Sequence, residues 1–270
     1  MNSITLRYVG EVKIERDEHG VPHIHAGSEA DLFFGQGYIQ AFDRGLQMLL
    51  TRILCQGRAG ECLDSSDELL GIDIFFRKMN WGGDAGQEVS RISMLDREIL
   101  QAYCEGINAC FKSRIPWELK LLGYKFERWK PEDSIMLSRM IGYISLAQSQ
   151  AEIERFIVEM IQKDVEREKL EELFPGKLGG LDIDLLKKVS LGERIVPAAL
   201  IWKNAVPLVL ASNNWVISGE KTRSGKALLA NDPHLETNRL PNVWQEMSLK
   251  TGERYLTGAG MPGVPGVLIG

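Results

Sequence analysis

Apolar and polar side chains alternate at the start of the chain. In residues 5–25 the alternation runs on both sides of the tetrapeptide Asp17-Glu-His-Gly20, with Val12 and Ile14 before it and Val21 after it. Period-two alternation around a glycine turn is typical of a β-hairpin. The chain is therefore predicted to open with two paired strands.

After this hairpin the apolar positions recur every three or four residues, which predicts helices. The first helix is expected after Ser28, which serves as N-cap, with Asp31 three residues later completing a box-like cap. Helical spacing returns in residues 95–111. A further helix is expected from Pro131, since proline and two acidic residues favour a first turn. Residues 151–174 are predicted to form one long charged amphipathic helix.

The pattern changes in the last third of the chain. Residues 178–211 are loosely patterned and contain prolines, which suits a spacer. Beyond Ser212 the sequence predicts strands at residues 214–218, 226–231 and 243–249, and Val267-Leu-Ile269 resembles the beginning of a buried strand. A helix-rich first part followed by a β-rich second part predicts an α+β fold.

Composition and charge narrow the classes of function. The chain has 270 residues, of which 44% are hydrophobic and 26% charged, and its formal net charge is −5. The charges are of mixed sign, so neither nucleic acid nor a membrane surface is an expected partner, and a small molecule is favoured. The longest apolar candidate, residues 195–211, is interrupted by prolines and Lys203, which argues against a membrane span. The chain starts without a signal peptide, so a cytoplasmic location is expected.

Cysteine and histidine spacing does not predict a metal or redox site. The cysteines are Cys55, Cys62, Cys104 and Cys110, which match neither a C-x-x-C motif nor paired zinc ligands. They are expected to be small buried side chains. A bridge between Cys104 and Cys110 is not expected, because six residues of helix rise by about 9 Å. His19, His23 and His25 would share a strand face but lack an acidic or cysteine partner at ligand spacing.

Ser212 is the candidate nucleophile. It lies between the apolar segment 206–211 and the predicted strand that begins at Asn214. A serine between a linker and a strand is by itself most often a turn residue. No G-x-S-x-G elbow surrounds it, so the α/β-hydrolase triad is not indicated.

A series of motifs, in order along the chain, changes this interpretation. They are Asp17-Glu-His-Gly-Val-Pro-His-Ile-His-Ala26, Asp31-Leu-Phe-Phe-Gly-Gln-Gly-Tyr-Ile-Gln-Ala-Phe-Asp-Arg44, Gln47-Met48, Gly57-Arg-Ala-Gly-Glu61, Leu121-Leu-Gly-Tyr-Lys-Phe-Glu-Arg-Trp-Lys-Pro-Glu-Asp133, Ser212-Asn-Asn-Trp-Val-Ile-Ser-Gly219, Asn231-Asp-Pro-His-Leu235 and Pro262-Gly-Val-Pro-Gly266. Together they resemble the front portion of penicillin acylases. The resemblance covers essentially the whole chain.

The resemblance implies an N-terminal-nucleophile hydrolase, an αββα sandwich in which two antiparallel sheets lie between helical layers. It also implies a precursor that cleaves itself between Ala211 and Ser212. Residues 1–190 would form an α-chain-like region, 191–211 a spacer and 212–270 the truncated start of a β chain. After processing, an α/β heterodimer is expected. The freed α-amine of Ser212, with a reference pKa of about 8, would act as base for its own hydroxyl.

The resemblance also assigns supporting residues. His234 would orient the α-amine or the reacting group, and Asn231 would position the same network. Met140 and Tyr143 would line the acyl pocket, and Glu152 would ligate a structural calcium, the only cofactor implied. Each has a plain structural alternative: a turn residue for His234 and Asn231, a core side chain for Met140 and Tyr143, and a solvent-facing helix residue for Glu152.

Two classes of function follow. The first is an amidohydrolase of a linear amide that works through an acyl-serine intermediate. The oxyanion donors that the resemblance implies would lie beyond Gly270, so the isolated chain is expected to be weakly active or inactive. The second is a non-catalytic fragment or binding module that requires a complementary chain. Members of the resembled family are commonly periplasmic or secreted, which conflicts with the cytoplasmic expectation.

Overall fold

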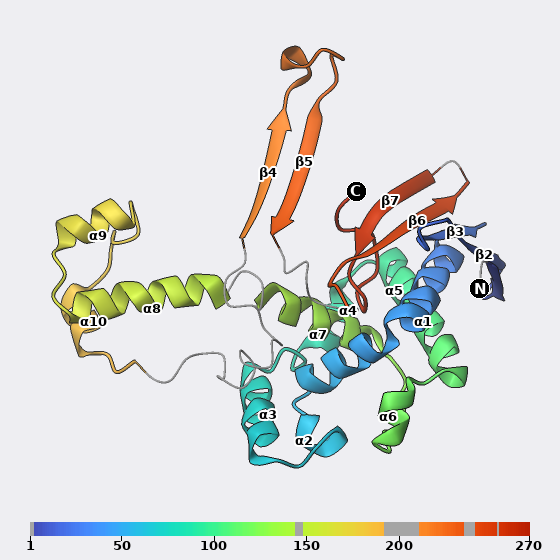
Figure 1. The fold of residues 1–270 in the computed structure, drawn as a ribbon, viewed down its shortest axis with the longest axis horizontal. Helices are drawn as coiled ribbons and strands as arrows, with labels where there is room; N and C mark the ends of the chain where they lie inside the picture. The colour runs from blue at the N-terminus through green and yellow to red at the C-terminus, as the bar shows by residue number, and fades with distance from the viewer. Residues whose placement is uncertain (1–2, 144–147, 192–210, 235–240, 253) are drawn as a thin grey trace. The chain divides into compact units, whose positions relative to one another are not determined.

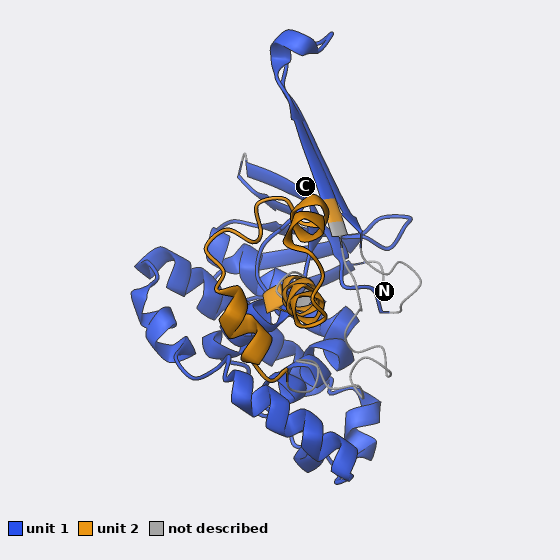
Figure 2. Cartoon of the chain, turned by 90° about the vertical axis from the view of Figure 1, so that its left-hand side faces the viewer, with its two compact units in different colours: residues 1–141, 213–270 blue, residues 142–212 orange. Residues whose placement is uncertain are grey.

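The computed structural model describes residues 3–143, 148–191, 211–234, 241–252 and 254–270 (Figure 1). These residues form two compact units, one of residues 1–141 with 213–270 and one of residues 142–212 (Figure 2). No helix in the described ranges has both the length and the apolar character to cross a bilayer. The units are defined by contacts within the fold. They do not test the predicted division of the chain by cleavage into residues 1–190, 191–211 and 212–270.

A five-stranded sheet in the first unit joins the two ends of the chain. Its order is β1 (Ser3–Arg7), β2 (Glu11–Arg16), β3 (Pro22–Ala26), β6 (Gln245–Thr251) and β7 (Arg254–Gly260). All neighbours are antiparallel except β3 and β6, which run parallel. The predicted opening hairpin is thus confirmed as β2 and β3, and β6 confirms the strand expected at 243–249. Strands β1 and β7 lie at the two edges.

The turn between β2 and β3 has a local cause. Gly20 has a φ of 81°, a conformation that a residue without a Cβ adopts without strain. The Asp17 carboxylate accepts hydrogen bonds from the backbone N–H groups of His19 (3.0 Å) and Val21 (2.9 Å). This Asx-type bonding closes the turn and sets the register that pairs Ile14 with Ile24.

Helices α1 (Glu29–Cys55) and α5 (Met94–Ser113) cover one face of the sheet and form the main core. The helices approach closely at two glycines: a Cβ at Gly37 would overlap the Tyr103 carbonyl, and one at Gly106 would overlap the Phe34 carbonyl. The core is made of side chains that are at most 6% exposed. They are Val12, Ile14, Ile24, Leu32, Phe34, Ile39, Ala102, Met247 and Leu249.

The predicted start of α1 is confirmed. Ser28 is the N-cap, and its hydroxyl oxygen accepts a hydrogen bond from the Asp31 N–H at 3.2 Å. The Asp31 carboxylate also accepts from the N–H groups of Val9 (2.9 Å) and Gly10 (2.8 Å), which ties the β1–β2 turn to the helix. Burial opposes the charge of Asp31, but a hydrogen bond from the Ser28 hydroxyl (2.6 Å) and those from the two N–H groups outweigh it and lower its pKa.

The other helices of the first unit are shorter. Of these, only α7 was predicted, and its start at Pro131 is confirmed. α5 confirms the helix predicted at 95–111, with Ser93 as N-cap. The short helices are α2 (Ala59–Cys62), α3 (Asp67–Met79), α4 (Ala85–Arg91), α6 (Trp117–Leu121) and α7 (Pro131–Gly142).

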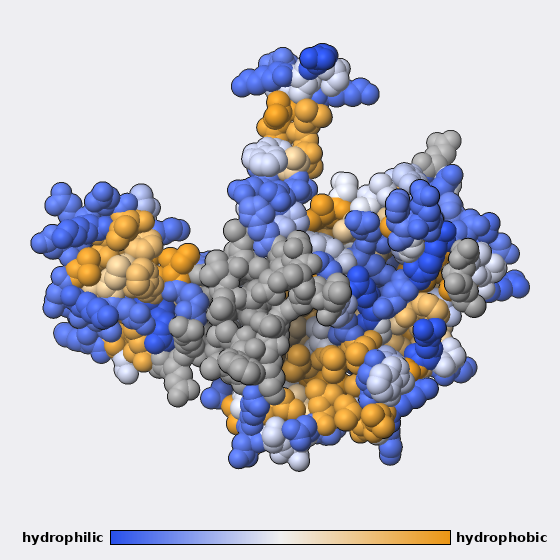
Figure 3. Space-filling view, in the orientation of Figure 1, coloured by the Kyte–Doolittle hydropathy of each residue, from blue (hydrophilic) through white to orange (hydrophobic). Residues whose placement is uncertain are grey.

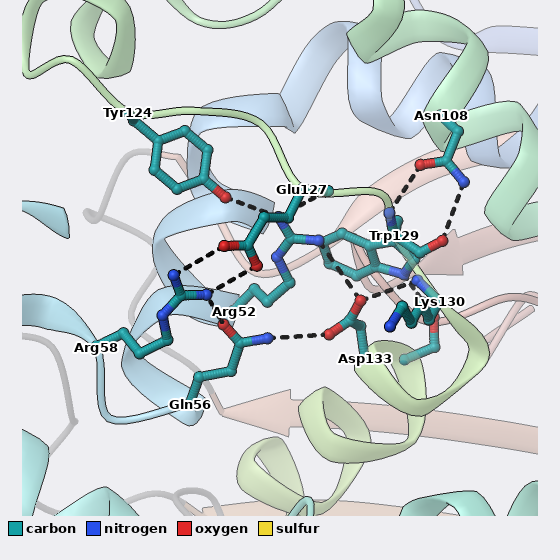
Figure 4. A network of polar contacts seen from close by, with 10 residues as sticks. Arg52, Gln56, Arg58, Asn108, Tyr124, Glu127, Trp129, Lys130 and Asp133 are labelled. Atoms are coloured by element: carbon teal, nitrogen blue, oxygen red, sulfur yellow. Dashed lines mark hydrogen bonds and ion pairs between the residues drawn. The ribbon is translucent and has the colours of Figure 1, made fainter. Parts of the chain in front are cut away.

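A buried polar network joins α1 to the segment that precedes α7 (Figure 4). The Arg52 guanidinium, 2% exposed, donates to the Tyr124 hydroxyl (2.7 Å) and the Glu127 carbonyl (3.0 Å), and lies 3.5 Å from the Asp133 carboxylate. Its carbon also lies 5.1 Å from the centre of the Trp129 ring. Burial raises the pKa of Asp133, and the Arg52 charge only partly offsets this effect.

Hydrogen bonds from buried polar side chains also hold the segment Met261–Gly266 in place. Gln36 exchanges a pair of 2.9 Å hydrogen bonds with the backbone of Gly266. The fully buried Tyr103 hydroxyl accepts from the Gly263 N–H at 3.0 Å and donates to Gln40. Gln40 in turn donates to the Met261 carbonyl at 3.4 Å. Side chains of α1 and α5 therefore set the path of this segment.

The second unit corrects one prediction. Residues 151–174 do not form a single helix, because α8 (Gln148–Gln162) ends near Asp164, whose φ of 57° is left-handed, and α9 (Arg167–Leu173) follows. The break lets both helices bury apolar side chains in one cluster of Ile157, Ile161, Leu170 and Leu178. A third helix, α10 (Ile183–Lys188), lies within the loosely patterned residues 178–211 and before the spacer predicted at 191–211. Residues 192–210 lie outside the described residues.

The expectation that the cysteines are buried is confirmed for three of the four. All four are free thiols; Cys55, Cys104 and Cys110 are buried, and Cys62 is half-buried. Cys104 and Cys110 both lie on α5, as the argument against a bridge assumed. Burial raises the pKa of the Cys110 thiol to about 12, so this side chain is an inert part of the core.

Candidate functional site

The candidate nucleophile lies on a hairpin of β4 (Ala211–Ile217) and β5 (Leu228–His234). The two strands run side by side in opposite directions (Figure 1). Gly219 and Gly225 lie in the connecting loop. The Thr222 hydroxyl closes the loop by donating to the Lys226 carbonyl at 2.7 Å, and Gly225 has a φ of 68°.

Ser212 is exposed and is the second residue of β4, which begins directly after the undescribed residues 192–210. The predicted cleavage position, between Ala211 and Ser212, therefore coincides with the first peptide bond of a strand. The apolar side chains that follow Ser212 also face solvent (Figure 3). Trp215 is 57% exposed and Val216 72%, and on β5 Leu229 is 65% exposed.

The predicted supporting residues lie on β5, at the end of the hairpin that also carries Ser212. His234 Nε2 is 2.8 Å from a carboxylate oxygen of Asp232, and both side chains are about half exposed. Alternate residues of a strand share a face, so this pair stands on one face of β5 and Asn231 on the other. The partner that orients the His234 ring in this structure is thus Asp232. The assigned roles of His234 and Asn231 stay predictions.

The predicted pocket residues lie at the end of α7 and just beyond it. Met140 is 6% exposed, and its sulfur lies 3.0 Å from the Cys55 thiol, which places it in the core. Tyr143 is half-buried; burial raises its pKa, and the nearby charge of Glu152 raises it further. Their part in an acyl pocket stays a prediction.

Glu152 does not by itself fit a calcium site. It is a half-buried residue of α8, close enough to Tyr143 for its charge to be felt there. Calcium takes six to eight oxygen ligands. Within the described ranges no three His, Cys, Asp or Glu side chains gather as a metal site would require. We therefore derive no chemical step through this ion.

Sequence reasoning missed the side chains that position the segment 261–266. Gln36, Gln40 and Tyr103 are buried polar residues on helices whose buried faces are otherwise largely apolar. The available signal was the pair of glutamines four residues apart on the core-facing stripe of α1. A buried amide requires hydrogen-bond partners, so such a pair indicates a polar element packed against the helix.

Comparison with known proteins identifies the family of this chain. The family model described as "Penicillin amidase" matches residues 11–270. The chain belongs to the penicillin amidase family. The resemblance that the motifs carry is thereby confirmed.

The curated relatives are acylases. The chain is 33% identical over 278 residues to an acyl-homoserine lactone acylase of Pseudomonas aeruginosa, covering 96% of this chain and 32% of that protein. It is 29% identical over 270 residues to the penicillin acylase 2 proenzyme of Pseudomonas sp. strain SE83, covering 94% and 34%. The chain thus spans about a third of the length of the curated relatives it matches.

A solved structure supports the fold. The thermostable penicillin G acylase from Alcaligenes faecalis aligns with a TM-score of 0.50 at 23% identity, covering 72% of this chain and 98% of the matched one. The mixed helix and sheet architecture is therefore shared with a penicillin acylase. The α+β fold class is confirmed at this level.

Proposed function

We propose that Ser212 is the nucleophile of an acylase that hydrolyses a linear amide into a carboxylic acid and an amine. The observation that carries the proposal is the position of Ser212 in a chain of this family. It is exposed near the start of a strand and follows directly on the segment predicted as a spacer. The complete protein would adopt the αββα sandwich of N-terminal-nucleophile hydrolases.

Activation begins with cleavage of the precursor. The Ser212 hydroxyl attacks the Ala211 carbonyl carbon, a C–O bond forms, and the peptide C–N bond breaks to leave an ester. Breaking this bond frees the Ser212 α-amine, which takes the hydroxyl proton. Water then hydrolyses the ester, so that Ala211 keeps a carboxylate and Ser212 regains its hydroxyl. This amine is partly neutral near pH 7 to 8, since its reference pKa is about 8.

Turnover uses the same hydroxyl. The α-amine takes the proton as the oxygen attacks the substrate carbonyl, and the proton passes to the leaving amine. The acyl group remains on Ser212 as an ester until water releases it as the acid. His234 would orient the α-amine, held by its 2.8 Å contact with Asp232, and Asn231 would support the same network.

Two substrate classes follow from the names of the relatives, acyl-homoserine lactones and penicillins. Both present a secondary amide with an apolar acyl group. In this proposal, Met140 and Tyr143 line the acyl pocket of the complete protein. The acyl preference is the property that separates the two classes.

Intact-mass spectrometry tests the proposal. Fresh complete protein incubated at neutral pH is expected to split between Ala211 and Ser212, whereas its Ser212→Ala variant should stay whole. Ser212→Cys is the matched control. It should still be cleaved, because its thiol places a nucleophile at the position of the serine hydroxyl. In the complete protein, Ser212→Ala should lower amidase activity by at least about a thousandfold. Cleavage and amidase activity that both survive Ser212→Ala would refute the assignment.

A second candidate has its own supporting observation. The exposed apolar side chains of β4 and β5 suit a strand pair that a complementary chain covers. In that case the chain is a non-catalytic module. Light scattering over a range of concentrations discriminates: self-association favours the module, while a monodisperse monomer counts against it.

A further inference from the structure

Helix α6 is a short helix of the first unit that has one side chain in the core (Figure 1). Leu119 is 1% exposed, whereas Trp117 is 70% and Leu121 79% exposed. Successive residues of a helix are rotated by about 100°, so the residues two before and two after Leu119 both point away from the core, within about 40° of each other. The outward face of α6 therefore presents an indole and a leucine side by side.

The end of α6 adds a third apolar side chain. Backbone hydrogen bonds close the turn after the helix, from the Gly123 N–H to the Lys120 carbonyl (3.0 Å) and from the Tyr124 N–H to the Leu119 carbonyl (2.9 Å). Gly123 has a φ of 74°, which a residue without a Cβ adopts readily. Leu122 in this turn is 53% exposed. Apolar side chains gathered in this way, rather than scattered singly, mark interaction sites.

Positive charge surrounds these apolar side chains along the chain. Residues 112–125 hold four cationic residues and a single carboxylate, that of Glu118, so the segment carries +3 in a chain of net charge −5. The cations are Lys112, Arg114, Lys120 and Lys125. All four are exposed, and none of the ion pairs formed within the described ranges involves them. Each lies within five residues of Trp117 or Leu121, which limits the Cα separation to about 18 Å.

Arg114 and Trp117 also border one hollow of about 370 Å³ between α1 and the start of α6. Its lining includes Phe42, Asp43, Leu46, Ile115, Pro116 and Glu118. The Arg114 guanidinium carbon lies 4.0 Å from the centre of the Phe42 ring, an arrangement that holds the cation in place. The Asp43 carboxylate is already paired with Arg16 at 2.6 Å. Apolar surface and a cation thus meet beside the outward face of α6.

The size of the apolar surface selects the kind of partner. A stable protein–protein contact covers about 800 Å² on each partner. Because an aromatic side chain buries about 150–250 Å², Trp117 with two leucines stays below that area even when wholly covered. A bilayer surface requires less. Indole rings favour the boundary between headgroups and acyl chains, leucine enters hydrocarbon, and cations attract anionic headgroups.

We propose that the outward face of α6, which we term the α6 patch and define by Trp117, Leu121 and Leu122, docks on a bilayer surface that contains anionic lipids. The three apolar side chains enter the interface, and the cations of residues 112–125 meet the headgroup phosphates. The expectation that no membrane surface is a partner rests on the charge of the whole chain, which averages over this cluster. The contact uses the first unit alone and does not depend on Ser212.

Co-sedimentation of the complete protein with vesicles tests the electrostatic part. The protein should bind vesicles of equal parts phosphatidylglycerol and phosphatidylcholine, release them at high salt, and bind phosphatidylcholine vesicles far more weakly. Lys120→Gln combined with Lys125→Gln should weaken binding about 25-fold, since each cation contributes about fivefold. Lys163→Gln with Lys177→Gln is the matched control: it removes the same charge from exposed lysines of the second unit and should have little effect.

The apolar part has its own test. Leu121→Ser should weaken binding about tenfold, whereas Leu185→Ser, at a residue 57% exposed on α10, should not. Lipids with brominated acyl chains quench an indole that enters the bilayer. Trp117→Phe keeps an aromatic ring in the patch, so this variant should still sediment with vesicles but lose most of the quenching. Trp215→Phe, at a residue 57% exposed on β4, should retain the quenching.

Three results would overturn the proposal. They are equal binding to the two vesicle compositions, a control lysine pair as damaging as the pair at α6, and quenching that survives Trp117→Phe. Absence of vesicle binding by a complete protein with a native circular dichroism spectrum would also overturn it, and would mean that another part of the protein or a protein partner covers the patch. None of these results bears on the proposed role of Ser212.

Discussion

The five-stranded sheet and the β4–β5 hairpin contain similar side chains but bury them differently. On the sheet, Val12 and Ile24 are fully buried and Ile14 is 1% exposed, whereas on the hairpin Trp215 is 57% and Leu229 65% exposed. The difference arises because α1 and α5 cover the sheet. Strand formation follows from the local pattern, but stabilisation by burial, about 25 cal/mol per Å² of apolar surface, requires a covering layer.

The largest expected change in stability comes from the buried polar network of Arg52 and Asp133, which lies in the unit that contains the five-stranded sheet. Arg52→Met should lower the free energy of unfolding by about 3–5 kcal/mol near pH 7, because it leaves the Asp133 carboxylate buried without its cation. Urea unfolding measures this loss. Arg58→Met is the matched control: Arg58 pairs with Glu127 at 2.8 Å in a partly exposed site, where ion pairs contribute about 1 kcal/mol or less.

The unfolding free energy of the same variant should also depend on pH, and it should fall as the pH rises. The folded-state pKa of Asp133 is raised by burial and held down by Arg52. A raised carboxyl pKa contributes stability below the unfolded value of about 3.9 and loses it as pH rises through the folded value. Without Arg52 the pKa rises further, so the unfolding free energy of Arg52→Met should fall by a larger total amount as the pH rises above about 4. A parallel decline in both proteins would contradict this.

The next effect concerns the close approach of α1 and α5. Gly106→Ala should cost about 3 kcal/mol or prevent folding, since the new Cβ overlaps the Phe34 carbonyl. Gly71→Ala, on α3 where nothing lies within 4 Å of the added Cβ, should instead stabilise by about 0.5–1 kcal/mol. Thermal melts followed by circular dichroism compare the two. Equal effects would show that the helices do not pack this closely in solution.

The smallest expected effect is on the hairpin. Trp215→Ser and Leu229→Ser should each change the free energy of unfolding by less than about 0.5 kcal/mol, because these side chains are already in solvent. Ile24→Ala in the sheet should cost about 2–5 kcal/mol. Urea unfolding of the three variants gives the contrast directly. A hairpin variant that costs more than about 1 kcal/mol would mean that another surface covers the hairpin.

Local chemistry predicted much of the fold. The Asp17–Gly20 turn, the Ser28 cap and the Pro131 helix start were all read from short patterns, and all are present. The helix predicted at 151–174 failed because burying Ile157 and Leu170 in one cluster requires a bend at Asp164. Tertiary packing there overrides a helical pattern that continues on both sides of the bend.

The candidate site was less predictable from local pattern. Ser212 has the surroundings of a turn residue, and only the order of motifs along the chain singled it out. The Asp232 partner of His234 follows from strand alternation once β5 is known. The hydrogen bonds of Arg44 to the Asn242 and Trp244 carbonyls join residues about 200 positions apart, and no spacing rule links such distant segments.

The parallel pairing of β3 with β6 imposes a delay on biosynthesis. His23 leaves the ribosome early, but its partner Ser248 is added near the end of this chain. At about 5–20 residues per second, the open edge of β3 waits on the order of 10–45 s for its neighbour. During that interval an unpaired strand edge is a template for pairing with other nascent chains. The yield of soluble protein should therefore depend on how well a chaperone shields the first hairpin.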